Sequence, residues 1–567
     1  MIKEQILKNL KEILNVILRQ AQNNNLIDLQ PPANASFGDY STSVALKLTK
    51  LLKKNPMEIA EQIKNNFPKT NFIEKIDIIK PGFINFWILD VQLINQLTKT
   101  AQDNFVFPEF HLGKNKKVMV EFAHPNTHKL FHIGHLRNIS TGESIVRILE
   151  AVGNKVVRSN YQGDVGLHIA KCLYGIRNSK FEINKLVTLK EKIEFIGQMY
   201  TKGTKAYEEN KKAKEEILKI NKMIYNQSLE IKDLWEKTRQ WSLDYYDKTY
   251  KRVYSHFDRL YFESELPKRG IKICNDLLKK RLLEKSQGAI VFNGKKYGVD
   301  TRVFINSLGL PTYEGKELAL AEKEFSEFGE LDKNIHCVTP EQSSFFKVTF
   351  KVEELIDEKK YKGRQYHLIY EWVKLKAGKM SSREGNVIEG NWLIDETKKK
   401  IIGKFKCDKK IAEVLAIASV KYSFLKNSLS NVIAFDIDES ISIEGNSAPY
   451  LIYTFVRCQS VLKKANLNTL TRQLFNRLTI NNDELNLLRK FYQFPEVVYK
   501  AAESYAPNFI ANYLYELASE YNLFYQKNPI LKAEKETKEL RLLITIATAK
   551  IIKKGLELLG IKTVEKM

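Results

Sequence analysis

Cysteine is scarce in this sequence, and no long apolar run is present. The 567 residues include five cysteines, without any C-x-x-C spacing, which are Cys172, Cys274, Cys337, Cys407 and Cys458. This pattern argues against a disulfide framework and a thiolate zinc site, and it favours a reducing cytoplasm. Lysine and glutamate interrupt the apolar positions of residues 1–20, which predicts an amphipathic helix. Neither a signal peptide nor a membrane span is expected.

A G-x-x-x-x-G-K-[ST] loop is also absent, which excludes a P-loop enzyme. Acidic residues are outnumbered, because Lys+Arg total 91 against 67 Asp+Glu, and the formal net charge is +24. A net positive charge of this size attracts polyanions such as nucleic acid. A composition biased toward lysine, asparagine and isoleucine explains the same charge, so charge alone leaves the partner open.

The length of the chain and its 43% hydrophobic content predict three or four domains. An alternating segment at 83–88 predicts a strand within a small α+β unit. From Lys117 the pattern changes to strand, turn, helix and strand, which begins a doubly wound sheet expected to resume near Ala289. The expected domains are residues 1–110, α+β; residues 111–400, α/β with a helical insertion at about 175–290; and residues 401–567, all-α.

Four histidines follow the predicted strand Val118–Phe122, at His124, His128, His132 and His135. Histidines four residues apart on a helix can bind a metal, but Pro125 disfavours helix at the first of them. A polar turn between a strand and a helix directs backbone N–H groups to one point, which suits a phosphate. The phosphate interpretation is preferred, and the metal interpretation is the alternative.

A second segment, 378–386, combines a lysine, two serines, an arginine and two glycines. A basic loop of this kind can close over a triphosphate, although alone it is more often a solvated turn. Two such segments on one α/β core are more specific than either, and together they predict a nucleotide site.

His132-Ile-Gly-His135 resembles the HIGH motif of class I aminoacyl-tRNA synthetases, and Lys379-Met-Ser-Ser-Arg383 resembles their KMSKS loop. Several further segments narrow the resemblance to the arginyl-tRNA synthetase family, and it covers nearly the whole chain. These segments are 120–126, 158–166, 257–258, 311–317, 38–40, 81–85, 445–457 and 558–567. The resemblance implies a Rossmann-like catalytic domain, an N-terminal domain that binds the D-loop of tRNA, and a helical anticodon-binding domain.

The resemblance implies ATP-dependent ligation of L-arginine to tRNA(Arg) through an arginyl-adenylate, in protein synthesis. ATP with Mg²⁺ would be a substrate, and no zinc is expected. The expected partners are tRNA(Arg), L-arginine and ATP, without a membrane. The expected form is a cytoplasmic monomer.

The resemblance assigns catalysis to His132, His135, Lys129 and Lys379. It assigns ATP binding to His132, Gly134, His135, Lys379, Met380 and Ser381. Ser382 stands where the KMSKS loop has its second lysine, and Lys129, just ahead of the HIGH motif, would supply the missing charge. The alternative is that Lys129 is a solvated loop residue.

The resemblance also implies an arginine site. Glu121 and Asn126 would hold the α-amino and carboxylate end of the substrate, while Tyr313, Glu317 and Gln342 would line the pocket for its side chain. Carboxylates suit this pocket because a guanidinium presents five donors in a planar fork. Glu317 replaces the aspartate usual in the family, and the alternative places it on a helix surface facing a lysine.

For tRNA, Phe83 and Asn85 resemble residues that read the D-loop, by stacking and by hydrogen bonding. Phe83 is equally well explained as a core residue of its strand. Tyr450, Tyr453 and Arg457 would contact the anticodon, or form a helix-packing face. Met567 would also lie close to the anticodon.

Two rival functions remain at this point. A class I synthetase for another amino acid, such as cysteine, would usually need a zinc site, and no suitable cluster of cysteine and histidine occurs in the sequence. A non-catalytic RNA-binding paralogue would lose the nucleotide motifs, whereas H-I-G-H is complete. A hydrolytic editing domain is not expected, because the insertion is charged and helical.

Overall fold

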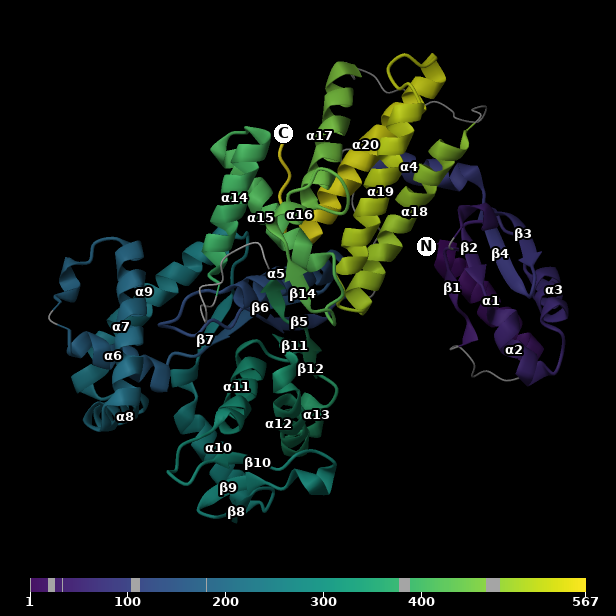
Figure 1. The fold of residues 1–567 in the computed structure, drawn as a ribbon. Coiled ribbons are helices and arrows are strands. Elements are labelled where there is room, and N and C mark those ends of the chain that lie inside the picture. Colours follow the sequence, from purple (N-terminus) through teal and green to yellow (C-terminus); the bar gives the residue numbers. More distant parts are fainter. Residues whose placement is uncertain are drawn as a thin grey trace. The chain divides into compact units, whose positions relative to one another are not determined.

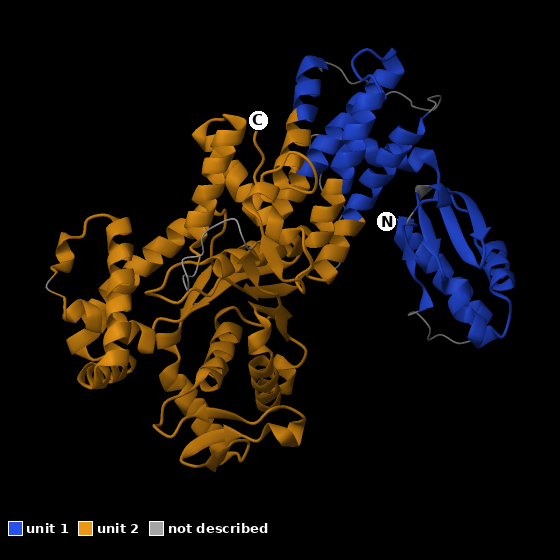
Figure 2. Cartoon of the chain, in the orientation of Figure 1, with its two compact units in different colours: residues 1–106, 457–495, 516–552 blue, residues 107–456, 496–515, 553–567 orange. Residues whose placement is uncertain are grey.

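The computed structural model describes residues 2–18, 26–32, 34–102, 113–179, 181–376, 388–465 and 480–567. The chain divides into two compact units, which Figure 2 shows in different colours. The first unit comprises residues 1–106, 457–495 and 516–552. The second comprises residues 107–456, 496–515 and 553–567.

The first unit contains a four-stranded antiparallel sheet in the order β1-β2-β4-β3 (Figure 1). Its strands are β1 (Leu29–Gln30), β2 (Tyr40–Thr42), β3 (Ile73–Ile79) and β4 (Phe83–Ile88). Its N-terminal helices are α1 (Ile2–Leu18), η2 (Ala35–Phe37), α2 (Val44–Leu52), α3 (Pro56–Asn66) and α4 (Asp90–Ala101).

The predicted strand at 83–88 coincides with β4. Ile84, Phe86 and Ile88 are each at most 2% exposed and share one face, as the two-residue period of a strand requires. Helix α3 begins where Asn55 accepts a hydrogen bond from the Met57 amide and Pro56 occupies the first turn. Local sequence therefore accounts for most of this α+β unit.

The second unit is built on a five-stranded parallel sheet in the order β12-β11-β5-β6-β7. Its strands are β5 (Lys117–Glu121), β6 (Lys155–Gln162), β7 (Arg259–Phe262), β11 (Lys333–Val338) and β12 (Gln365–Ile369). The connection from β5 through α5 (Ile133–Ala151) to β6 is the predicted βαβ unit. The predicted α/β class is confirmed, because this is a doubly wound sheet.

The order of the strands creates a switch point at β5. The chain leaves β5 toward β6 on one side, whereas β11 lies on the other side of β5. In an open α/β sheet, ligands bind at the carboxyl ends of the strands beside such a point. Glu121 ends β5 and lies in register with His336 of β11, so both side chains belong to this edge.

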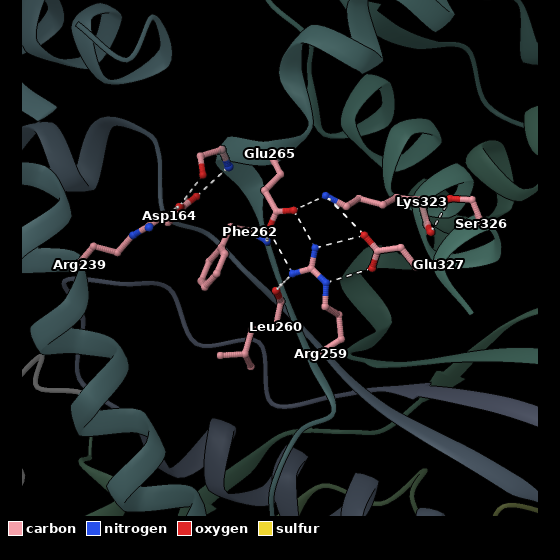
Figure 3. Close-up of polar contacts among 10 residues, drawn as sticks. Asp164, Arg239, Arg259, Leu260, Phe262, Glu265, Lys323, Ser326 and Glu327 are labelled. Carbon is pink, nitrogen blue, oxygen red and sulfur yellow. Dashed lines mark hydrogen bonds and ion pairs between the residues drawn. The ribbon is translucent and has the colours of Figure 1, made fainter. Parts of the chain in front are cut away.

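Strand β7 lies inside the segment, about 175–290, that is expected to be a helical insertion. The charged residues of that segment suggest solvated helices. Arg259 donates to Glu265 Oε2 at 2.8 Å and to Glu327 Oε2 at 3.0 Å, and Figure 3 shows both carboxylates around its guanidinium. Tyr261 is fully buried. The ion pairs compensate the charge, so Arg259 can lie on an edge strand of the sheet.

The sheet therefore resumes at β7, and the prediction that it resumes near Ala289 is wrong. That region forms a separate antiparallel sheet in the order β10-β9-β8. Its strands are β8 (Glu284–Ser286), β9 (Ala289–Phe292) and β10 (Arg302–Ile305). The alternation of strand residues is visible in sequence, but the partner of each strand is not.

The helical insertion has a core of its own, formed by α6, α7, α8 and α9 (Figure 1). Helix α7 begins with a capping box between Thr188 and Glu191. The helices between β6 and β12 are α6 (Leu167–Arg177), η3 (Ile183–Lys185), α7 (Leu189–Glu209), α8 (Lys211–Tyr225), α9 (Leu229–Arg252), η4 (Glu263–Glu265), α10 (Pro267–Lys279), η5 (Gly294–Tyr297), α11 (Tyr313–Glu327), η6 (Pro340–Gln342), α12 (Ser343–Ile356) and α13 (Glu358–Tyr361).

The rest of the chain is mainly helical. Its helices are α14 (Gly390–Phe405), α15 (Lys409–Leu425), α16 (Ile437–Ser440), α17 (Ala448–Ala465), α18 (Asn482–Glu503), α19 (Asn508–Lys527) and α20 (Lys535–Leu558). Two short strands, β13 (Val373–Leu375) and β14 (Ile433–Phe435), pair in parallel. Among the described residues, no helix has the length and apolar character needed to span a membrane.

Candidate active site

Two histidines cap the N-terminus of α5. Nδ1 of His132 accepts hydrogen bonds from the amides of Gly134 (3.1 Å) and His135 (3.3 Å). Nδ1 of His135 accepts from the amide of His132 at 3.2 Å, and the ring centroids are 3.6 Å apart. Because each Nδ1 accepts, the proton of each neutral ring is on Nε2. Both rings can therefore donate to an anion at a helix end that already favours negative charge.

Burial keeps these rings neutral. It lowers the pKa of His132, and the charge of nearby Lys129 lowers it further. Burial also places the pKa of His135 well below its usual value, with smaller effects of His132, His124 and Lys129. Neutral imidazoles that donate through Nε2 stabilise a phosphate without forming a permanent ion pair.

The ring of His132 packs against the backbone of Gly134, where a side chain would not fit. A Cβ at this position would lie 2.9 Å from Cε1 and 3.0 Å from Nδ1 of that ring. The predicted role of Gly134 in ATP binding remains a prediction.

We expect Gly134→Ala to push the His132 ring off the helix cap and remove its two hydrogen bonds. The loss of the cap should lower the free energy of unfolding by about 1 kcal/mol. The single-turnover rate of adenylate formation should fall roughly tenfold, since one oriented donor is misplaced. Gly197→Ala is the control, because a Cβ there meets nothing within 4 Å. Equal rates in the two variants would contradict this role of Gly134.

Lys129 lies beside the two histidines. Its side chain is exposed, and its carbonyl accepts from the Tyr246 hydroxyl at 2.7 Å. Its charge lowers the pKa of His132, His135 and His168, which places the ammonium group near all three rings. The lysine is solvated, and it also faces the candidate phosphate site.

The backbone directly after the predicted cationic loop, residues 378–386, pairs with the backbone around His132. The amide of Ile133 donates to the Ile388 carbonyl at 2.8 Å, and the amide of Gly390 donates to the Phe131 carbonyl at 2.7 Å. Glu389 pairs with His132 in a β-bridge. The predicted ATP-binding residues of this loop lie outside the described residues; they are Lys379, Met380 and Ser381, followed by Ser382 and Arg383.

His124 and His128 do not join the two capping histidines. His128 is 1% exposed, and its ring nitrogens lie 3.1 Å from Thr127 Oγ1 and 2.8 Å from Thr238 Oγ1. His124 points to the carbonyl of Tyr161 at 3.4 Å. Both threonine contacts use the nitrogens that a metal would need, so His128 is a structural residue. Within the described ranges, no group of three or more His, Cys, Asp or Glu side chains has an arrangement that could hold a metal ion.

Glu121 and Glu317 lie in a buried acidic cluster at the carboxyl end of β5. Glu317 is 4% exposed, so the alternative that it lies on a helix surface is wrong. Its neighbour Lys316 instead pairs with Glu263. Oε2 of Glu121 and Oε1 of Glu317 have no hydrogen-bond donor among the described residues. These buried acceptors suit a substrate that brings several N–H donors and a positive charge.

Burial changes the protonation of this cluster. It raises the pKa of Glu317 to about 8; the neighbouring His336 opposes this shift, and the charges of Glu121 and Glu324 add to it. It raises the pKa of Glu121 to about 7. The two carboxyl groups therefore take up protons near neutral pH unless a cation is bound.

The remaining predicted arginine-binding residues lie around this edge of the sheet. The carbonyl of Asn126 accepts from the Tyr246 hydroxyl at 2.6 Å, and its Oδ1 faces Gly163. Tyr313 begins α11, is 68% exposed and lies under the Lys316 ammonium group at 4.6 Å. Gln342 is exposed before α12. Among the described residues, no hydrogen bond or ion pair joins Tyr313 or Gln342 to the carboxylate of Glu317.

The loop that faces Asn126 is held in place by Asp164. This carboxylate accepts from Arg239 Nη1 at 2.7 Å and from the amide of Ser264 at 2.8 Å, and Figure 3 shows the arginine pointing to it. Arg239 also lies over the ring of Trp235 at 4.7 Å. The insertion thereby fixes the end of β6 beside the site.

Sequence reasoning missed a group of polar residues behind the acidic cluster. His336 donates toward Glu121 Oε1 at 3.1 Å, and both Asn334 and His336 are fully buried. A signal was present, because two polar residues two positions apart interrupt the apolar strand β11 on one face.

The predicted tRNA-binding residues are in varied surroundings. Phe83 is 38% exposed, so the core alternative is wrong, whereas Asn85 is 2% exposed. Tyr453 is 39% exposed on α17, and the ring of Tyr450 lies 5.7 Å from that of Tyr515. Arg457 Nη1 donates to Asn522 Oδ1 at 2.5 Å, which is a helix-packing contact. Met567 is half-buried. Contact of these residues with tRNA remains a prediction.

The doubly wound sheet and the histidine cap at its switch point define a class I aminoacyl-tRNA synthetase. The model of the "tRNA synthetases class I (R), catalytic domain" family matches residues 97–437. The arginyl-tRNA synthetase N-terminal domain matches residues 1–88, and the DALR anticodon binding domain matches residues 451–567. The chain belongs to the arginyl-tRNA synthetase family, as its motifs predicted.

Individual relatives agree over nearly full length. The chain is 33% identical to the arginine–tRNA ligase of Fusobacterium nucleatum, with 95% of each sequence covered. It is 31% identical to that of Bdellovibrio bacteriovorus, covering 94% of this chain and 93% of the other. The arginyl-tRNA synthetase structure of Thermus thermophilus shares the fold at a TM-score of 0.84 and 24% identity, with both chains covered completely.

Proposed function

We propose that the site at the switch point activates arginine with ATP and transfers it to tRNA, with the predicted residues in their assigned roles. The overall reaction is that of the family: arginine, ATP and tRNA give arginyl-tRNA, AMP and diphosphate. The capping histidines carry the proposal, because two Nε2 donors meet a helix N-terminus beside a buried acidic cluster. An anion and a cation can thus be held next to each other.

The ATP site is proposed to consist of His132, Gly134, His135 and Lys129 on one side, with Lys379, Met380 and Ser381 on the other. The histidines would donate to phosphate oxygens as charge develops at the α-phosphorus. The carboxylate of arginine is the nucleophile, so catalysis is mainly positioning and charge stabilisation. Mg²⁺ is proposed to enter as part of the ATP substrate.

The arginine site is proposed to include Glu121, Asn126, Tyr313, Glu317 and Gln342. The proximity of Glu121 to Glu317 supports a shared role toward the guanidinium, besides the predicted role of Glu121 toward the α-amino group. Asn126, on the loop after β5, is the remaining candidate for the α-amino and carboxylate end. A site of this charge would reject citrulline, which leaves the carboxylates without a cation.

For tRNA, we propose that Phe83 and Asn85 contact the D-loop, and that Tyr450, Tyr453, Arg457 and Met567 lie near the anticodon. The exposed rings of Phe83 and Tyr453 support stacking on bases. The proposed division is residues 1–110, 111–400 and 401–567, in a cytoplasmic monomer. Light scattering with and without tRNA tests the monomer.

Pyrophosphate exchange with and without tRNA tests the proposed function. We expect exchange with arginine, dependent on tRNA and on Mg²⁺, and abolished by chelation with EDTA. Citrulline at the same concentration should give no exchange and is the matched control. Exchange that occurs with cysteine or lysine but never with arginine would refute the assignment.

A further inference from the structure

A buried polar network lies behind the proposed arginine pocket. Its ionisable and amide side chains come from β5, α11, β11 and α12, and each is at most 4% exposed. They are Glu121, Glu317, Glu324, Asn334, His336 and Glu353. This number of carboxyl groups exceeds what one guanidinium requires, so some of them must serve another purpose.

The ring of His336 lies next to Glu121. Its Nδ1 lies 3.1 Å from Glu121 Oε1, and its Nε2 lies 3.0 Å from Gln365 Oε1. The Gln365 amide is oriented by its own donation to Glu353 Oε2 at 2.7 Å. Because an ionised carboxylate can only accept, the form of His336 that carries hydrogen on Nδ1 donates to Glu121 Oε1.

Glu324 has a neutral amide as its partner. Its Oε2 accepts from the neutral amide of Asn334 at 2.7 Å. This contact lies on the same face of β11 as the contact between His336 and Glu121, because Asn334 and His336 are two positions apart on that strand. Glu121 Oε2, Glu324 Oε1 and Asn334 Oδ1 are buried, and none has a donor in the described part of the chain. Two carboxylates cannot hydrogen-bond to each other unless one of them holds a proton.

We propose that Glu324 is a positioning residue of the arginine pocket, whose carboxylic acid donates its proton to Glu121 and orients that carboxylate toward the substrate. This inference rests on the proposed function of the pocket. The hydrogen bond runs from the Glu324 O–H to Oε2 of Glu121, and no covalent bond changes. Glu121 then has a donor on each oxygen, one from His336 and one from Glu324.

The surroundings of Glu324 determine where the proton resides. Burial raises its pKa well above the usual value, and the charge of Glu121 raises it further, against a smaller effect of His336. Glu121, by contrast, is in direct contact with His336. The other groups whose charges interact with Glu324 are Glu317 on its own helix, Glu353 of α12, Tyr261 of β7 and Tyr361 at the end of α13. The proton therefore belongs to Glu324.

Three substitutions separate this role from simple packing. Glu324→Gln keeps the shape and supplies a permanent N–H donor, so the KM for arginine should stay within about threefold. Glu324→Met removes the donor, and Glu324→Asp moves it away from Glu121 by one methylene. Each should raise the KM for arginine by about tenfold or more with little change in kcat, because a buried anion loses a hydrogen bond. An equal rise in the glutamine variant overturns the proposal, as does no rise in the other two.

The pH dependence of KM tests the charge of Glu324 directly. The KM for arginine is expected to change with pH, and the midpoint of that change is the quantity measured. If Glu324 is protonated, Glu324→Gln leaves this midpoint at the pH found for the unsubstituted protein. If Glu324 is instead an anion, its removal lets Glu121 and Glu317 ionise more easily, and the midpoint moves to lower pH. A shifted midpoint overturns the proposal, and this measurement does not require that the methionine variant folds.

Glu317→Gln separates a failure of this inference from a failure of the proposed pocket. If Glu317→Gln leaves the KM for arginine unchanged, the pocket itself is elsewhere. If Glu317→Gln raises that KM while Glu324→Met and Glu324→Asp do not, only the role of Glu324 is overturned. The KM for ATP should remain unchanged in all four variants, since none lies at the histidine cap.

Discussion

Replacement of Glu317 by glutamine is expected to lower kcat/KM for arginine by about two to three orders of magnitude. The reason is that removal of one member of a buried ion pair costs about 3–5 kcal/mol. The substituted amide keeps the size of the side chain, but it presents an N–H group where the guanidinium also presents donors. The KM for ATP should change little. Steady-state kinetics with arginine and ATP varied separately measure both effects.

Glu322→Gln is the matched control for this prediction. Glu322 lies on the same helix as Glu317, but it pairs with Arg269 on the outer side of the helix. Its substitution should leave kcat/KM for arginine within about twofold, because exposed pairs contribute little. An equal loss in both variants would show that Glu317 stabilises α11 rather than binding substrate.

The same carboxylates give arginine binding a pH dependence. Burial raises the pKa of Glu317 to about 8 and that of Glu121 to about 7, and a guanidinium requires the ionised forms. The KM for arginine should therefore fall as pH rises from about 6 to 8.5, which follows from these pKa values. Glu317→Gln should flatten the upper part of that profile. The folded state holds these protons more tightly than the unfolded state, so their contribution to stability is fully present below pH about 4.5 and is lost as pH rises to about 8.

Replacement of Lys129 by alanine is expected to slow adenylate formation by about 100- to 1000-fold, the usual effect of removing one group that stabilises developing charge. Ser382 leaves the predicted cationic loop one charge short, and the charge of Lys129 acts on His132 and His135. Single-turnover kinetics measure the chemical step. The KM for arginine should change less than about threefold, since the ammonium group acts on the phosphates.

Lys155→Ala is the control for loss of charge. Lys155 is exposed at the start of β6, the opposite end of the strand from the switch point. Its loss removes one positive charge without approaching the site, so the single-turnover rate should be unchanged. If Lys129→Ala also leaves that rate unchanged, Lys129 is only a solvated loop residue.

The strand, turn and helix of the candidate phosphate site could be predicted because they are neighbours in sequence. Strand β5, the turn and the start of α5 follow one another within Lys117–His135, so local propensity and a single helix cap assemble them. The family, the fold class and the reaction followed from the same motif together with 378–386. The arrangement of the capping rings was not predicted, because hydrogen bonds from His132 to its own helix depend on side-chain geometry.

The acidic cluster could be predicted only in part. A glutamate in α11 has the same helix propensity whether it faces solvent or a pocket, so sequence left the position of Glu317 open. The charge of Arg259 hid strand β7, because the carboxylates that compensate it come from η4 and α11. Pairing partners distant in sequence carry no local signal.

The sequence by itself determined the family, the α/β class and the order of strand, turn and helix from β5 to α5, since these depend on residues close together in the chain. The tertiary structure alone decided that Glu121, Glu317, Glu324 and His336 share one buried network. Burial raises the cost of charge, and burial is a property of packing between β5, α11 and β11 rather than of any one segment.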